Sequence, residues 1–128
     1  MRAFAPLMAL CGTPAFAHHS FAMFDRKAEI VLTGTVTQFQ WKNPHTYIQL
    51  LSDKDKQDWT IEAGGVSYLD RLGWRRNSLH AGDKITVHAH PLRNGAAGAE
   101  LIWVVKPDGT KLVGSPESSE NRRILESR

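Results

Sequence analysis

The chain has 128 residues, of which 41% are hydrophobic and 23% are charged. This length corresponds to one domain, and this composition is that of a globular protein, which excludes a wholly disordered chain. The net charge of +3 comes from mixed signs with no basic run of five or more residues, so no nucleic-acid partner is expected.

Residues 1–17 have the order of a signal peptide. Arg2 gives a positive start, an apolar run follows over residues 3–12, and Ala15 and Ala17 occupy the −3 and −1 positions of an A-x-A cleavage site. The run is too short to cross a membrane, which takes about 20 residues, and no transmembrane segment is expected later either. The sequence therefore predicts export to the periplasm and removal of the leader. A buried amino-terminal strand or helix is the alternative.

Cys11 is the single cysteine of the chain and lies inside the predicted leader. If cleavage follows Ala17, the mature chain forms no disulfide and offers no thiolate to a metal or to catalysis. A lipoprotein acylated at Cys11 is the alternative, although the bulky Leu10 before it does not fit that pattern.

Five segments after the leader have the composition of β-strands. They are rich in β-branched and alternating apolar residues, and turn residues such as Asn43-Pro44 separate them. The expected strands cover residues 31–39, 46–51, 59–63, 84–90 and 99–106, and residues 111–113 are a candidate for a short additional strand. In the first strand, Gly34 is expected to mark a bulge or a bend.

A short helix is expected over residues 66–74, between the third and fourth strands. Ser67 is a candidate N-cap, Leu69 and Leu72 fall on one face, and Gly73 can end the helix.

The resulting order β-β-β-α-β-β is that of the OB-fold, a five-stranded Greek-key barrel. We therefore expect an all-β domain with one short helix, forming a small OB-like barrel over residues 18–114, and a flexible polar tail over residues 115–128. A sandwich with an accessory helix is the alternative architecture. Barrel closure would protect the strand edges and bury one core formed by Val36, Ile48, Ile61, Leu69, Ile85, Val87 and Leu101.

Several short motifs together resemble an uncharacterised family of exported proteobacterial proteins, classed as a domain of unknown function. The resemblance covers roughly residues 17–113 and implies secretion and one small β domain, without an established activity, substrate or catalytic residue. The histidines at positions 88 and 90 depart from it. The motifs are Ala17-His18-His19-Ser20-Phe21-Ala22, Phe24-Asp25, Leu32-Thr33-Gly34-Thr35-Val36, Trp41-x-Asn43-Pro44-His45, Gly73-Trp74 and Gly82-Asp83.

His18 becomes the first residue of the mature chain if the leader ends at Ala17. Its free α-amine, with a pKa of about 7.7–8.0, and its own imidazole can then chelate one metal ion near neutral pH. His19 or His45 can complete such a histidine brace, and nitrogen ligands of this kind suit copper(II). The alternative is a His-His start with only incidental metal affinity.

The remaining histidines also have structural interpretations. His45 begins a strand near Trp41, so its ring either faces a pocket mouth or packs on the indole. His88 and His90 have the i, i+2 spacing of ligands on one strand face, but two histidines do not complete a metal site. That face is expected to be exposed, so solvated polar residues are the favoured interpretation of both histidines.

Trp41, Asn43 and Trp74 are candidates for a ligand face, because OB-fold barrels bind ligands with aromatic side chains. Aromatic residues at alternating strand positions are more often part of the core, so packing in the core or at its rim is the favoured interpretation of the tryptophans. Glu62 and Asp83 are candidate cleft carboxylates, but no base is paired with them in the sequence.

A binding protein is expected rather than an enzyme, because the chain lacks a Gly-rich phosphate loop, a G-x-S-x-G elbow and an H-E-x-x-H motif. Its ligand would be a small molecule or an envelope protein. Copper binding through His18, His19 and His45 is the second hypothesis.

Overall fold

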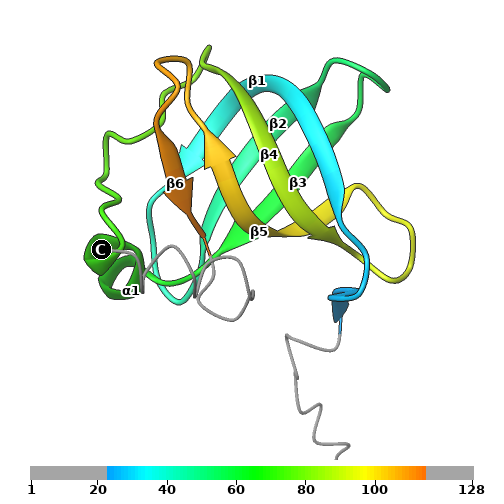
Figure 1. Cartoon of the computed structure of the whole chain (residues 1–128), viewed down its shortest axis with the longest axis horizontal. Helices are drawn as coiled ribbons and strands as arrows, with labels where there is room; N and C mark the ends of the chain where they lie inside the picture. Colours follow the sequence, from blue (N-terminus) through cyan, green and yellow to red (C-terminus); the bar gives the residue numbers. More distant parts are fainter. Residues whose placement is uncertain (1–22, 115–128) are drawn as a thin grey trace, which may run out of the picture.

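The structure, a computed structural model, describes residues 23–114, in which strands and helix follow one another in the predicted order (Figure 1). The predicted leader, the predicted tail and the two histidines at positions 18 and 19 lie outside the described residues. The elements are β1 (Ile30–Gln40), β2 (Thr46–Ser52), β3 (Asp58–Ala63), α1 (Val66–Arg71), β4 (Lys84–Pro91), β5 (Gly98–Val105) and β6 (Lys111–Val113).

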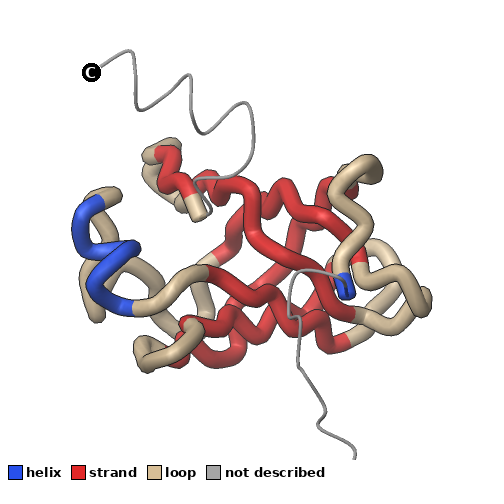
Figure 2. The backbone as a smooth tube through the Cα atoms, turned by 90° about the horizontal axis from the view of Figure 1, so that it is seen from below, coloured by secondary structure: helices blue, strands red, loops and turns tan. Residues whose placement is uncertain are grey.

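The sheet closes on itself. The long strand β1 pairs antiparallel with β2 on one side and with β4 on the other, and β5 pairs antiparallel with β4. Parallel pairing of β3 with β5, from Thr60↔Gly98 to Glu62↔Glu100, completes the ring. Seen from below, the strands form a ring and the helix α1 lies at one side of it (Figure 2). This closed five-stranded barrel confirms the OB-like architecture and excludes the sandwich.

Strand β1 can serve two neighbours because it bends. Gly34 pairs with Ser52 of β2 and with Ile85 of β4. A Cβ at this position would clash with the carbonyl oxygen of Leu51, so the close backbone approach requires glycine. The register shift itself falls between Val36 and Gln38, after the glycine that was expected to mark it.

The interior is filled by the residues that alternation in the strands predicts. All the expected core residues lie in one buried cluster, and Leu50, Trp74 and Val104 join them. Since successive strand residues point to opposite faces, each strand contributes one face to this cluster and the other to the outer surface.

Helix α1 begins at a cap that comes from another part of the chain. The N-cap residue is Gly65, which has no side-chain cap, so the predicted capping by Ser67 is wrong. Instead, the backbone N–H of Val66 donates to Oδ1 of Asn43 at 2.9 Å. At the other end Gly73 has a φ of 94°, a left-handed conformation that ends the helix as expected.

Trp74 ties the segment after α1 to the barrel. Its side chain is fully buried, its ring centroid lies 6.0 Å from that of Phe39, and its Nε1–H donates to the carbonyl oxygen of Val113 at 2.7 Å. A single residue therefore fixes both the core and the short strand β6.

We predict that Trp74→Phe lowers the free energy of unfolding by about 1–3 kcal/mol, because it leaves the buried Val113 carbonyl without its partner and leaves space in the core. Trp59→Phe is the matched control, since its Nε1–H bonds to Asp55 in an exposed position. It should change the free energy of unfolding by about 0.5 kcal/mol or less. Urea unfolding followed by circular dichroism compares the two variants, and equal stabilities would contradict the role given to Trp74.

Candidate functional site

The chain reaches β1 through residues 23–28, here called the lead-in, which lie along the end of β4. Phe24 forms a β-bridge with Leu92, and the N–H of Asp25 donates to the carbonyl oxygen of Pro91 at 2.8 Å. The N–H of Arg93 returns a bond of 2.9 Å to the carbonyl oxygen of Met23. The lead-in has no hydrophobic period in the sequence, and these backbone bonds give it a fixed position.

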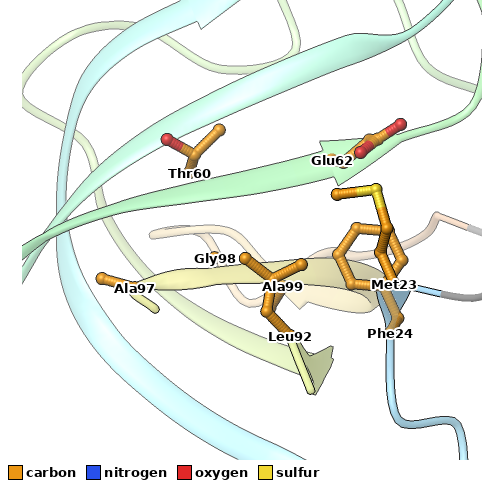
Figure 3. Close-up of a pocket in the computed structure, with 8 residues that line it drawn as sticks. All are labelled: Met23, Phe24, Thr60, Glu62, Leu92, Ala97, Gly98 and Ala99. Carbon is orange, nitrogen blue, oxygen red and sulfur yellow. The ribbon is translucent and has the colours of Figure 1, made fainter. Parts of the chain in front are cut away.

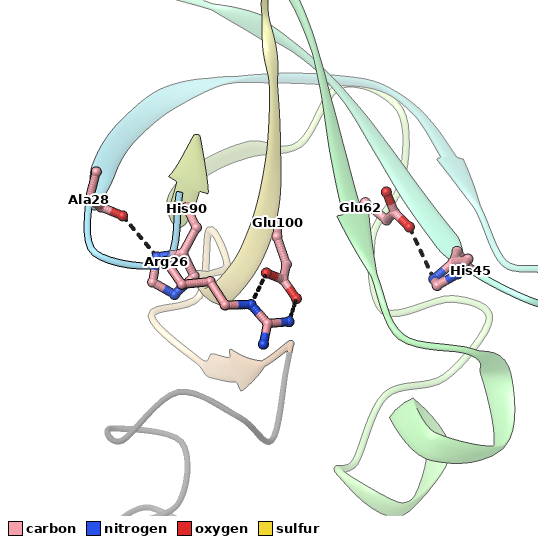
Figure 4. A network of polar contacts seen from close by, with 6 residues as sticks. All are labelled: Arg26, Ala28, His45, Glu62, His90 and Glu100. Atoms are coloured by element: carbon pink, nitrogen blue, oxygen red, sulfur yellow. Dashed lines mark hydrogen bonds and ion pairs between the residues drawn. The ribbon is translucent and has the colours of Figure 1, made fainter. Parts of the chain in front are cut away.

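An ion pair fastens the lead-in to β5 (Figure 4). Arg26 donates from Nε to Oε2 of Glu100 at 3.1 Å and from Nη2 to Oε1 at 2.8 Å. Such a two-point contact fixes the orientation of both side chains. Because Glu100 is buried, the guanidinium also supplies the positive charge that a buried carboxylate requires.

Four side chains form a row across neighbouring strands. Tyr47 on β2 lies opposite Glu62 on β3, which lies opposite Glu100 on β5, which lies opposite His90 on β4. Directly opposite residues share one face of a sheet, and the chain neighbours of these residues lie in the core. The row therefore lies on the outer side of the barrel, where it brings two carboxylates close together.

His45 is the residue that the structure pairs with Glu62 (Figure 4). Its Nδ1 lies 3.1 Å from Oε1 of the carboxylate, and the two side chains are 32% and 19% exposed. Burial raises the pKa of Glu62, the charge of His45 opposes the rise, and the nearby charge of Glu100 adds to it. Burial and then the charge of Glu62 likewise raise the pKa of Tyr47.

A pocket of about 230 Å³ opens between the lead-in and the seam of β3 and β5 (Figure 3). Most of its wall is apolar, and the carboxylate of Glu62 and the hydroxyl of Thr60 are its polar groups. It is lined by Met23, Phe24, Thr60, Glu62, Leu92, Ala97, Gly98 and Ala99.

Neither polar side chain of this pocket has a free hydrogen to donate. The Thr60 hydroxyl donates its own hydrogen to Oε1 of Gln49 at 3.0 Å. The Glu62 carboxylate accepts when ionised. The pocket therefore suits a ligand that donates hydrogen bonds.

The candidates for a ligand face lie away from this pocket. Trp74 is fully buried, Asn43 accepts the bond that caps α1, and Trp41 packs on the core with its ring centroid 6.0 Å from that of Phe39. Of the proposed metal ligands, His45 joins the site, whereas His18 and His19 lie outside the described residues. The other expected cleft carboxylate, Asp83, accepts the backbone N–H of His80 in a turn.

The expected pair of solvated histidines on β4 is wrong for His90. This side chain is buried, and its Nδ1 lies 2.8 Å from the carbonyl oxygen of Ala28. His88 stacks on Trp103, with ring centroids 3.4 Å apart. The extra residue at the register shift between His88 and Ala89 lies on β5, so His90 stays on the outer face of β4, where the lead-in covers it.

Residues 23–114 contain neither a cluster of metal ligands nor a helix that could span a membrane. No three His, Cys, Asp or Glu side chains in this range lie together in a way that could hold a metal ion. No helix in the same range is long and apolar enough to cross a membrane.

The raised pKa of Glu62 predicts a pH dependence of stability. The folded protein holds this proton more tightly than the unfolded chain does, so the stabilisation is present below the ordinary value of 4.5 and is lost as the pH rises through the higher folded pKa. Glu62→Gln should remove this loss, so the variant gains stability relative to the wild type between about pH 4 and about pH 7. Urea unfolding at about pH 4 and about pH 7 measures the difference in free energy of unfolding between the variant and the wild type. An unchanged difference would show that burial does not perturb this carboxyl.

Comparison with known proteins agrees with the resemblance seen in the sequence. The model of a family described as "Family of unknown function (DUF6152)" matches residues 7–100, which is more than half of the chain. The match includes the lead-in, His45, Glu62 and Glu100. No curated protein matches the chain. The chain therefore belongs to the family of unknown function DUF6152.

Proposed function

We propose that this protein is an exported periplasmic binding module that holds a small organic ligand in the pocket between the lead-in and the seam of β3 and β5. The signal-peptide order of residues 1–17 supports export. The observation that carries the binding proposal is the pocket itself, in which an apolar wall meets two polar groups, Glu62 and Thr60. Ligand sites commonly combine a mainly apolar lining with a few placed polar groups.

The dimensions of the pocket favour a small ligand. Its volume of about 230 Å³ lies below the roughly 300–1,000 Å³ of pockets that hold drug-sized molecules. Binding is favoured over catalysis because the Thr60 hydroxyl is engaged with Gln49, a neutral acceptor that cannot activate it as a base would.

A panel of small organic compounds, each with on the order of ten non-hydrogen atoms, tests this proposal by NMR. Binding in the pocket should shift the backbone amide signals of Thr60, Glu62 and Gly98. Shifts confined to the opposite side of the barrel, around α1, would contradict the assignment.

Substitution at the pocket wall provides a matched pair of variants. Ala97 lines the pocket, whereas its neighbour Ala96 is exposed and does not. Ala97→Leu should fill part of the volume and weaken binding at least about tenfold, whereas Ala96→Leu should bind as the wild type does. Equal binding by both variants would place the ligand elsewhere.

Copper binding by the mature amino terminus is the second candidate function. A histidine that ligates a metal usually donates its other ring N–H to a carboxylate, and the contact of His45 Nδ1 with Glu62 has this form. Met23 lines the same pocket as Glu62. His18 lies five positions before Met23, a stretch of at most about 18 Å, so a chelate that includes His45 is within covalent reach.

Correctly processed protein tests the copper proposal. Mass spectrometry should find His18 as the first residue, and His18→Ala should weaken copper(II) binding at least about tenfold, because it removes one arm of the chelate. His45→Ala should weaken binding in the same direction. His80→Ala, an exposed histidine beside Asp83, is the control and should bind as the wild type does. A mature chain that begins at Ser20 or later would exclude the proposal.

A further inference from the structure

We propose that the ligand of this pocket is a small primary ammonium ion with a short apolar body, held by the carboxylate of Glu62. The inference rests on the proposed binding function and adds the charge and shape of the ligand. It follows from which hydrogen-bonding groups line the pocket, from the charges around them and from the apolar wall opposite.

The side chains that line the pocket have no free hydrogen-bond donor. Thr60 has given its hydrogen to Gln49, and Glu62 as a carboxylate has no hydrogen to give. Within residues 23–114 the carboxylate contacts His45 through Oε1, and a carboxylate offers about four lone-pair positions in all. Acceptor capacity therefore remains for a further donor. An ammonium group carries three donors and no acceptor, which complements this lining.

The charges around the pocket also favour a cationic ligand. Glu62 and Glu100 are opposite each other on β3 and β5, and Arg26 is engaged with Glu100 through two bonds. When His45 is uncharged, this group of side chains carries one net negative charge, and it is centred on Glu62. A cationic ligand would supply the missing charge, whereas an anionic ligand would be repelled at close range.

The rest of the pocket wall is formed by apolar and small side chains. The ring of Phe24 and the side chain of Leu92 face the pocket beside the small residues 97–99, while Met23 lies next to Glu62 (Figure 3). A short aliphatic or aromatic stem can therefore lie against the apolar wall while its ammonium group contacts Glu62. A volume of about 230 Å³ favours a short body over a drug-sized one.

Three probes with the same aromatic body separate these contributions by isothermal titration calorimetry on the full chain after removal of the leader. They are phenethylammonium, which is positive, phenethyl alcohol, which is neutral, and hydrocinnamate, which is negative. Phenethylammonium should bind at least about tenfold more tightly than the alcohol, because a charge-assisted bond to the carboxylate is stronger than a neutral one. Hydrocinnamate should bind more weakly than either.

Glu62→Gln then tests the residue. The amide keeps the shape of the side chain and removes its charge, so phenethylammonium should lose at least about tenfold in affinity, while phenethyl alcohol keeps its affinity. Asp58→Asn removes an exposed carboxylate from the same strand at a position outside the pocket, and it should leave both affinities unchanged. Circular dichroism verifies that the variants fold. If Glu62→Gln does not fold, the three probes on the wild type still decide the matter.

The outcomes separate this inference from the proposed function. Equal affinities for the ammonium and the alcohol, or an ammonium affinity that survives in Glu62→Gln, would overturn the inference while leaving a ligand pocket. The inference would also be overturned, and the ligand pocket retained, if a neutral or anionic compound shifts the pocket amides while phenethylammonium does not bind. If neither the probes nor the compound panel shift those amides, both proposals fail.

Discussion

The site depends on one constraint, the parallel pairing of β3 with β5 that closes the barrel. Only the positions from Thr60↔Gly98 to Glu62↔Glu100 take part. At one end of this short seam the side chain of Leu92 packs over Gly98, where a Cβ would clash with it. At the other end two carboxylates are forced into adjacent positions. The same closure thus produces the small-residue wall of the pocket and its acidic end.

The two carboxylates of the seam are compensated in different ways. Glu100 receives the guanidinium of Arg26, whose two bonds also hold the lead-in against β5. Glu62 receives only the contact from His45 among the described residues, and burial raises its pKa. One acid therefore stabilises the fold while the other keeps capacity for a ligand. This difference is why the proposals centre on Glu62, although the two residues lie side by side and have the same chemistry.

The sequence predicts what depends on local pattern. Alternation in the strands identifies the core, and turn residues separate the elements in the observed order. The helix cap is different, because Asn43 lies 23 residues from Val66 and becomes its partner only after the barrel has closed. His90 was expected in solvent for a similar reason, since the lead-in that covers it has no period of its own. The small residues 97–99 carry no chemical signal, so the pocket could not be located from the sequence. His45 and Glu62 were both candidates, but their pairing needed the register of β2 and β3.

Closure of the seam in solution is the central claim, and nuclear Overhauser effects of the mature protein test it most directly. A closed seam predicts cross-strand contacts between Ile61 and Ala99 and between the neighbouring pairs from Thr60↔Gly98 to Glu62↔Glu100. Their absence, in a sample that still shows the pairing of β1 with β4, would mean an open sheet without this pocket and would contradict the account.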